Sequence, residues 1–168
     1  DYGDKKIIPG FIDIHNHGYG GWSMTDPATI DIVKGFSKAM ASIAVTTVLP
    51  TAKYAAFEAV ADCMEEEYSG ARIHGIHSEG PFWARGGENT VGDEYPLPDL
   101  DMTKDYIAKC KGKLVMMAIA PELPGAYDVI RLLHKEGIKV AAAHTKAFAK
   151  DIQLAMKEVG LDIVTHMC

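Results

Sequence analysis

The sequence predicts an α/β fold built on a parallel sheet, and three observations support this fold class. Short runs rich in Val, Ile and Ala alternate with longer amphipathic stretches along the chain. A glycine stands near the end of most of the amphipathic stretches, shortly before the next apolar run. No linker, low-complexity segment or simple repeat interrupts the pattern. Repeating βα units of this kind form a parallel sheet that is either doubly wound or closed into a barrel.

Six apolar runs have the length and side-chain character of buried parallel strands. The runs are Ile7–His15, Ala44–Thr51, Arg72–Glu79, Lys113–Pro121, Lys139–Thr145 and Asp162–His166. Five amphipathic stretches separate them. The first opens at Asp26 and Pro27, which suit the N-cap and the first turn of a helix. The other helices are expected over Lys53–Ser69, Leu100–Lys111, Ala126–Glu136 and Phe148–Val159. Helix-ending glycines are expected at Gly70, Gly112, Gly137 and Gly160.

Composition places the 168-residue chain among ordinary globular proteins, as one domain or as part of a larger one. Its residues are 48% hydrophobic, 24% charged and 8% aromatic, which excludes a disordered chain, a collagen-like repeat and a disulfide scaffold. The net charge is −6 and no basic stripe exists, so nucleic acid is not an expected partner. No apolar run approaches the roughly 20 residues of a membrane span. Three cysteines without paired spacing, and no visible targeting segment, predict a cytoplasmic protein with reduced thiols.

Imidazole and carboxylate groups gather at the carboxyl ends of the expected strands. Taken alone, any one of these histidines is more simply explained as a hydrogen-bonded core residue. Their combination favours a site for Zn²⁺ or another divalent transition metal, because these ends converge on one side of a parallel sheet or barrel. The group consists of His15, His17, His77, Glu79, His144 and His166.

Two of these regions resemble motifs of known enzymes. The segment from Pro9 to Gly18 (PGFIDIHNHG) resembles the first strand of the amidohydrolase superfamily, whose members are metal-dependent (β/α)8 proteins. The segment from His77 to Phe82 (HSEGPF) resembles the H-x-E-G-P-F motif of the N-acetylglucosamine-6-phosphate deacetylase family, a narrower group. Further similarities to that family follow in chain order: Thr46-Thr47 with Pro50-Thr51, Ala120–Glu122, Ala143–Ala147 and Thr165–Met167.

The resemblance implies a metal site and an architecture. Glu79, His144 and His166 would hold the principal metal, and His15 with His17 would allow a second one. Zinc is the expected metal, as one or two ions, with Fe, Mn and Co as alternatives. The fold implied is a partial (β/α)8 TIM barrel with about six βα units present and the last two strands missing.

Residues 1–168 would then form a single, incomplete catalytic-barrel domain, without the β-sandwich domain and the C-terminal barrel strands of the family. The general acid/base of the family is an Asp on the last barrel strand, which would lie beyond Cys168. We therefore expect no normal turnover from this chain alone. Relatives lead us to expect a homo-oligomer, by analogy only.

The reaction implied is hydrolysis of the acetamide of N-acetylglucosamine 6-phosphate, an amino sugar phosphate, to glucosamine 6-phosphate and acetate. The long irregular stretch Phe82–Pro98 is a candidate substrate loop. In it Asn89 is expected to bind a sugar hydroxyl and Arg85 a phosphate. Glu88 is the third candidate substrate-binding residue, although its carboxylate would repel a phosphate. The histidine that the family commonly places here is absent.

Three alternatives remain open at this point. The chain could act on another N-acyl amino sugar, or it could be an inactive fragment that only binds metal. It could also hydrolyse a cyclic amide, as dihydroorotases do with a carbamylated lysine on strand four. Leu114–Ala120 holds no lysine, which disfavours the cyclic-amide reading.

Overall fold

The computed structural model describes residues 3–87 and 94–166 of the chain. Its main sheet is parallel and follows the order β1 (Phe11–Asn16), β4 (Val45–Ala52), β6 (Ile76–Glu79), β7 (Leu114–Ile119), β8 (Lys139–Ala142) and β9 (Ile163–Val164), with β5 (Arg72–Ile73) also pairing with β4. Each strand lies beside the next one along the chain. That order is typical of a barrel wall, because a doubly wound sheet reverses its strand order near the middle.

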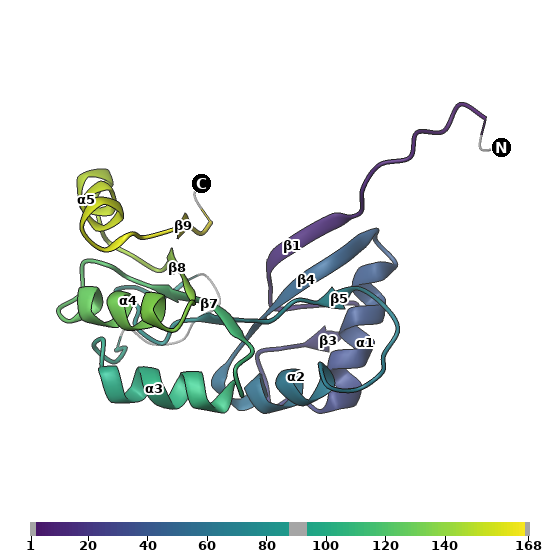
Figure 1. The fold of residues 1–168 in the computed structure, drawn as a ribbon, viewed down its shortest axis with the longest axis horizontal. Helices are drawn as coiled ribbons and strands as arrows, with labels where there is room; N and C mark the ends of the chain where they lie inside the picture. Colours follow the sequence, from purple (N-terminus) through teal and green to yellow (C-terminus); the bar gives the residue numbers. More distant parts are fainter. Residues whose placement is uncertain (1–2, 88–93, 167–168) are drawn as a thin grey trace.

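The helices cover the outer side of this curled, half-barrel sheet (Figure 1). They are α1 (Ile30–Ala41), α2 (Phe57–Cys63) after a short 3₁₀ turn η1 (Tyr54–Ala56), α3 (Leu100–Lys109), α4 (Ala126–Lys135) and α5 (Ala149–Val159). Among the described residues, no helix combines the length and the apolar character that crossing a membrane requires.

The strand predictions hold for position, and the structure changes their bounds. The expected strand Arg72–Glu79 is split at Gly75, where β7 passes close by: a Cβ on Gly75 would lie 2.5 Å from Val115 Cγ1. The expected strand Lys139–Thr145 ends three residues earlier, at Ala142, and the expected strand Asp162–His166 ends two residues earlier, at Val164. The sequence reading also missed a small hairpin, β2 (Gly18–Tyr19) with β3 (Trp22–Ser23).

The helix predictions hold for number and place, with two corrections. The first helix begins at Ile30 rather than at Pro27, because the Thr29 side chain caps it by accepting a hydrogen bond from the Ile32 N–H. The second ends at Cys63, well before Ser69. Three consecutive glutamates, 65–67, follow that end, where negative charge opposes the helix dipole. All four predicted helix-ending glycines have positive φ angles, from 72° at Gly160 to 132° at Gly70.

The two faces of the sheet are buried by different sets of side chains. Between sheet and helices lies the large core, which includes Met117, Ile119 and Val140. On the concave face lies a small cluster, which includes Met116, Ala118, Ala141 and Ala143. Side chains of successive strand residues point to opposite faces, and these two clusters follow that alternation along β7 and β8.

Candidate metal centre

The centre is built around the carboxylate of Glu79, the last residue of β6. Only 6% of its side chain is exposed, and the Nε2 atoms of four histidines approach its oxygens. Glu79 Oε2 is 2.8 Å from His17, whereas Glu79 Oε1 is 2.7 Å from His166, 3.2 Å from His144 and 3.5 Å from His15. Residues that lie between 62 and 87 positions from Glu79 in sequence thus meet at one point because parallel strands end at the same edge of the sheet.

Strand alternation explains how His15, His17 and Glu79 reach this point. His15 lies in β1 and His17 directly follows the end of that strand. Because the two residues are two positions apart, their side chains point to the same side, toward the carboxylate. Ring centroids of His15 and His17 are 5.1 Å apart, and those of His15 and His166 also 5.1 Å. These contacts agree with the prediction that His15 and His17 share one face.

His144 and His166 reach the carboxylate in a different way. Ala141 and Ala143 belong to the concave cluster, so alternation alone would turn His144 toward the helices. Its backbone instead adopts a left-handed conformation, with φ of 49°, and His166 has φ of 39°. Non-glycine residues rarely occupy this region, and at functional sites it serves to aim a side chain. Here the change of backbone turns both imidazoles toward Glu79.

The ligand atoms form two groups that share one residue. Glu79, His144 and His166 make one group, and Glu79, His15 and His17 make the other; within each, the donor atoms lie within 4.8 Å of one another. Their members are the residues that the family resemblance implies as ligands. Zinc–ligand lengths of about 2.0–2.1 Å place tetrahedral donors roughly 3.3 Å apart, so donor atoms gathered this closely are able to share one ion.

The electrostatics of the cluster suit a cation. Burial by itself would raise the pKa of Glu79, but hydrogen bonding from His17 and His166 and the field of His15 outweigh it and hold the pKa well below its usual range. Burial lowers the pKa of His15, and this outweighs the opposing effect of Glu79. An ionised carboxylate and an imidazole that favours its neutral form are the states that ligate a divalent metal.

His77 lies behind this cluster rather than in it. It is completely buried, and its Nδ1 is 3.2 Å from the Ile14 carbonyl oxygen and 3.4 Å from Thr51 Oγ1. Its ring centroid is 5.0 Å from that of His15. Burial lowers the pKa of His77 to about 4. His77 therefore supports the strand that carries His15, and it belongs to neither ligand group.

The predicted substrate residues lie on the loop after β6. Arg85 is exposed, and its backbone N–H donates to the His144 carbonyl oxygen at 3.1 Å. Glu88 and Asn89 lie outside the described residues. Sequence reasoning missed Trp83 on the same loop, whose ring stacks on His144 with centroids 4.3 Å apart. Its position directly after the H-x-E-G-P-F motif was the available signal.

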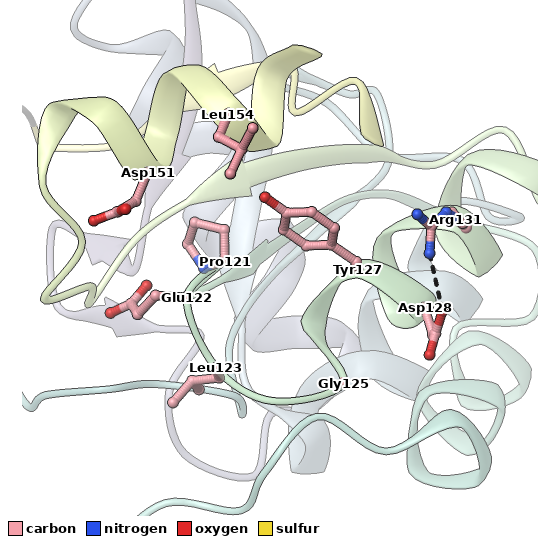
Figure 2. A pocket seen from close by; sticks show the side chains of 9 residues that line it. All are labelled: Pro121, Glu122, Leu123, Gly125, Tyr127, Asp128, Arg131, Asp151 and Leu154. Atoms are coloured by element: carbon pink, nitrogen blue, oxygen red, sulfur yellow. Dashed lines mark hydrogen bonds and ion pairs between the residues drawn. The ribbon is translucent and has the colours of Figure 1, made fainter. Parts of the chain in front are cut away.

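Two hollows lie beside loops that follow strands of the sheet. One, of about 540 Å³, begins at His17 and follows the β2–β3 hairpin. The other, of about 490 Å³, lies between the loop after β7 and helices α4 and α5, and no candidate ligand lines it. Figure 2 shows the second hollow, with the ring of Tyr127 near Leu154 and with Asp128 paired to Arg131.

A curled parallel sheet with a carboxylate and four imidazoles at the carboxyl ends of its strands resembles the metal-dependent amidohydrolases as a class. Comparison with known proteins narrows the class: the chain is similar to N-acetylglucosamine-6-phosphate deacetylases in sequence and in structure, which confirms the resemblance seen in the motifs. No protein-family model matches the chain.

The chain is similar in sequence to curated deacetylases from several organisms. The N-acetylglucosamine-6-phosphate deacetylase of Vibrio furnissii is 31% identical over 162 residues, which cover 92% of this chain and 40% of the relative. The N-acetylgalactosamine-6-phosphate deacetylase of Escherichia coli O157:H7 is 27% identical, and the match covers 96% of this chain and 45% of that protein. The chain thus spans less than half the length of the curated relatives it matches.

Solved structures carry the similarity in fold. N-acetyl-D-glucosamine-6-phosphate deacetylase from Mycobacterium smegmatis, a mutant in complex with N-acetyl-D-glucosamine 6-phosphate, superposes with a TM-score of 0.75 and 30% identity over 95% of this chain and 42% of that one. The Pasteurella multocida enzyme gives a TM-score of 0.78 at 20% identity, over 93% of this chain and 42% of that one, and shows the fold alone.

Proposed function

We propose that this chain provides the metal centre of a hydrolase that converts N-acetylglucosamine 6-phosphate to glucosamine 6-phosphate and acetate. The observation that supports this most is the shared ligand geometry, in which one buried carboxylate serves two pairs of imidazoles. The similarity to deacetylases over nearly the whole chain supports the choice of substrate. In this proposal the half-barrel sheet is part of an eight-stranded (β/α)8 barrel, within a protein that also has a β-sandwich domain.

Glu79, His144 and His166 would hold the principal metal ion, and Glu79 with His15 and His17 would hold a second ion. Nitrogen and oxygen donors at this spacing fit zinc best, with Fe, Mn and Co as alternatives. A divalent ion in such a site supplies a Lewis acid that polarises the amide carbonyl and lowers the pKa of water.

The protein's own residues have three tasks in this reaction. Glu79 keeps the centre anionic, because its pKa lies well below neutral pH. The imidazoles present their Nε2 atoms toward the carboxylate. His17 is 39% exposed at the mouth of the hollow along the β2–β3 hairpin, so it can meet a substrate as well as a metal. The proton for the leaving amine would come from an aspartate outside this chain.

A second candidate substrate has its own support. The similarity to the E. coli N-acetylgalactosamine-6-phosphate deacetylase is nearly as extensive as that to the glucosamine enzymes. N-acetylgalactosamine 6-phosphate is the epimeric sugar phosphate. It would need different contacts to its hydroxyl groups but the same metal centre. Two contacts stay predictions: Arg85 with the phosphate and Asn89 with the sugar. The repulsion of phosphate by Glu88 is also a prediction, and so is a cytoplasmic location.

The test measures acetate release by the zinc-loaded, full-length gene product that carries this sequence. Its substrates are N-acetylglucosamine 6-phosphate, N-acetylgalactosamine 6-phosphate and unphosphorylated N-acetylglucosamine. We expect the highest kcat/KM with the first, and a loss of activity in Glu79→Gln. A higher kcat/KM with the galactosamine substrate would favour the second candidate. No acetate release from any of the three by a metal-loaded protein would contradict the proposal.

A further inference from the structure

His144 is enclosed by a short segment of the loop that follows β6. The ring of Trp83 stacks on the His144 ring, with centroids 4.3 Å apart and planes inclined by 27°. Only 10% of the His144 side chain is exposed. Trp83 also contacts the ring of Tyr95, at 5.2 Å between ring centroids.

The backbone of the same segment holds the backbone of His144. The N–H groups of Ala84 and Arg85 both donate to the His144 carbonyl oxygen, at 2.9 and 3.1 Å. Gly87 lies close to the edge of the imidazole ring, because a Cβ added to Gly87 would be 2.9 Å from His144 Cε1. Segment 82–87 therefore contacts three parts of His144: the face of its ring, the edge of its ring and its carbonyl oxygen.

The segment is anchored to the body of the molecule before it reaches His144. Phe82 is completely buried in the main core, and its carbonyl oxygen accepts a hydrogen bond from the Ala120 N–H at 2.9 Å. This anchor fixes the segment to the end of β7, the strand that lies between Glu79 and His144 in the sheet.

His144 needs such support because its conformation is unfavourable. Its φ of 49° lies in the left-handed region, and this backbone is what turns the ring toward Glu79 rather than toward the helices. Such conformations persist where surrounding contacts impose them. A ligand that is held in place before the metal arrives loses less freedom on binding, so its affinity for the metal is higher.

We propose that Trp83, with segment 82–87, is a positioning clamp that holds His144 in the orientation needed for metal binding. The clamp rests on the metal centre proposed above, in which His144 is a ligand. Segment 82–87 also carries Arg85, so one short stretch of chain would both position a metal ligand and hold a predicted substrate residue.

The experiment measures the zinc affinity of the full-length gene product that carries this sequence, in metal-free form, by competition with a chromophoric chelator. We expect Trp83→Ala to weaken binding by about 10- to 100-fold, as losses of residues that orient a ligating histidine do. Trp83→Phe keeps an aromatic face against His144 and should bind within about threefold of the wild type. Tyr127→Ala is the matched control and should keep wild-type zinc affinity, because it truncates an aromatic side chain on α4 that packs on the main core and lines the hollow without candidate ligands.

A second variant and a spectroscopic readout separate positioning from folding. Gly87→Ala leaves Trp83 in place but displaces the His144 ring, so it should weaken zinc binding by itself. The visible absorption spectrum of the cobalt-loaded chain should change in Trp83→Ala and return in Trp83→Phe. If Trp83→Ala does not fold, Gly87→Ala decides the question.

The possible failures are distinguishable. Wild-type zinc affinity in both Trp83→Ala and Gly87→Ala, with an unchanged cobalt spectrum, would overturn the clamp and leave the metal centre intact. A wild-type chain that binds zinc no better than Glu79→Gln would overturn the centre, and the clamp with it.

Discussion

Glu79 is the residue on which both ligand groups depend, because it is their shared member and is almost completely buried. We predict that Glu79→Gln lowers zinc affinity by at least about 100-fold, since a neutral amide replaces the anionic ligand. Atomic emission of protein dialysed against zinc measures the effect. Glu136→Gln, an exposed change at the end of α4, is the control and should keep full metal content.

The second ligand group makes a separate prediction at the residue scale. His15→Ala combined with His17→Ala should reduce bound zinc from about two ions per chain to about one, because Glu79, His144 and His166 remain. The complementary pair, His144→Ala with His166→Ala, should remove the principal ion. Two ions per chain in the first double variant would remove the second site from the description.

The residues of this centre could be predicted from sequence, but the way two of them reach it could not. Their position at the ends of apolar runs, and the motif around Glu79, point to the ligand set. Strand alternation, applied strictly, turns His144 away from Glu79. The left-handed backbone that corrects this depends on contacts with residues some 60 positions earlier, which a local pattern does not contain.

At the scale of elements, a single carboxylate joins α4, β8 and the start of β9. Asp162 accepts hydrogen bonds from Lys139 Nζ at 2.7 Å, from the Val140 N–H at 2.9 Å and, with His134 Nε2 as donor, at 2.9 Å. Burial acts to raise its pKa, but Lys139, Val140 and His134 outweigh burial, so the pKa lies below the ordinary value of 3.8. This depression stabilises the folded chain wherever Asp162 is ionised.

We predict that Asp162→Asn lowers the free energy of unfolding at pH 7 by about 1–3 kcal/mol. The wild-type advantage should be complete above pH 3.8, the carboxyl's ordinary pKa, and should be lost as pH falls through the lower folded-state pKa. Urea denaturation in the presence of a chelator, at several pH values, measures it. Asp101→Asn, on the exposed face of α3, should leave stability unchanged. A wild-type advantage that persists at the acid limit would contradict the assignment.

Sequence patterns predict the main strands but not every element or every boundary. Alternating βα units predicted each of the six main strands, because long periodic segments carry a strong signal. The β2–β3 hairpin has two residues in each strand, which is too short for a period to appear. The split at Gly75 depends on the approach of Val115 from the neighbouring strand, which is a tertiary contact.

At the scale of the whole molecule, the sheet has β1 at one edge and β9 at the other within the described residues. The strand order follows from consecutive βα units, since each right-handed crossover sets the next strand beside the last. The amount of curl does not follow from the pattern. It depends on packing across the concave face, where small alanine side chains lie beside Leu49 and Met116.

The exposed edge strand β1 leads to a prediction about self-association of the purified chain. Phe11 is 59% exposed and Ile12 is 69% exposed, so the strand offers apolar side chains beside an open sheet edge. Exposed, apolar edge strands pair with other chains, because their backbone groups and side chains both gain partners. We predict that the 168-residue chain self-associates in a concentration-dependent way. Sedimentation velocity across a range of concentrations measures the association.

Charged substitutions at this edge should weaken that association, because a lysine opposes both the burial of the strand and its pairing with a second copy. Phe11→Lys combined with Ile12→Lys should shift the chain toward monomer at every concentration. Leu100→Lys is the matched control, since Leu100 is also apolar and 42% exposed but lies on α3, away from the edge. If the double variant and the control associate equally, a surface other than the β1 edge joins the copies of this chain.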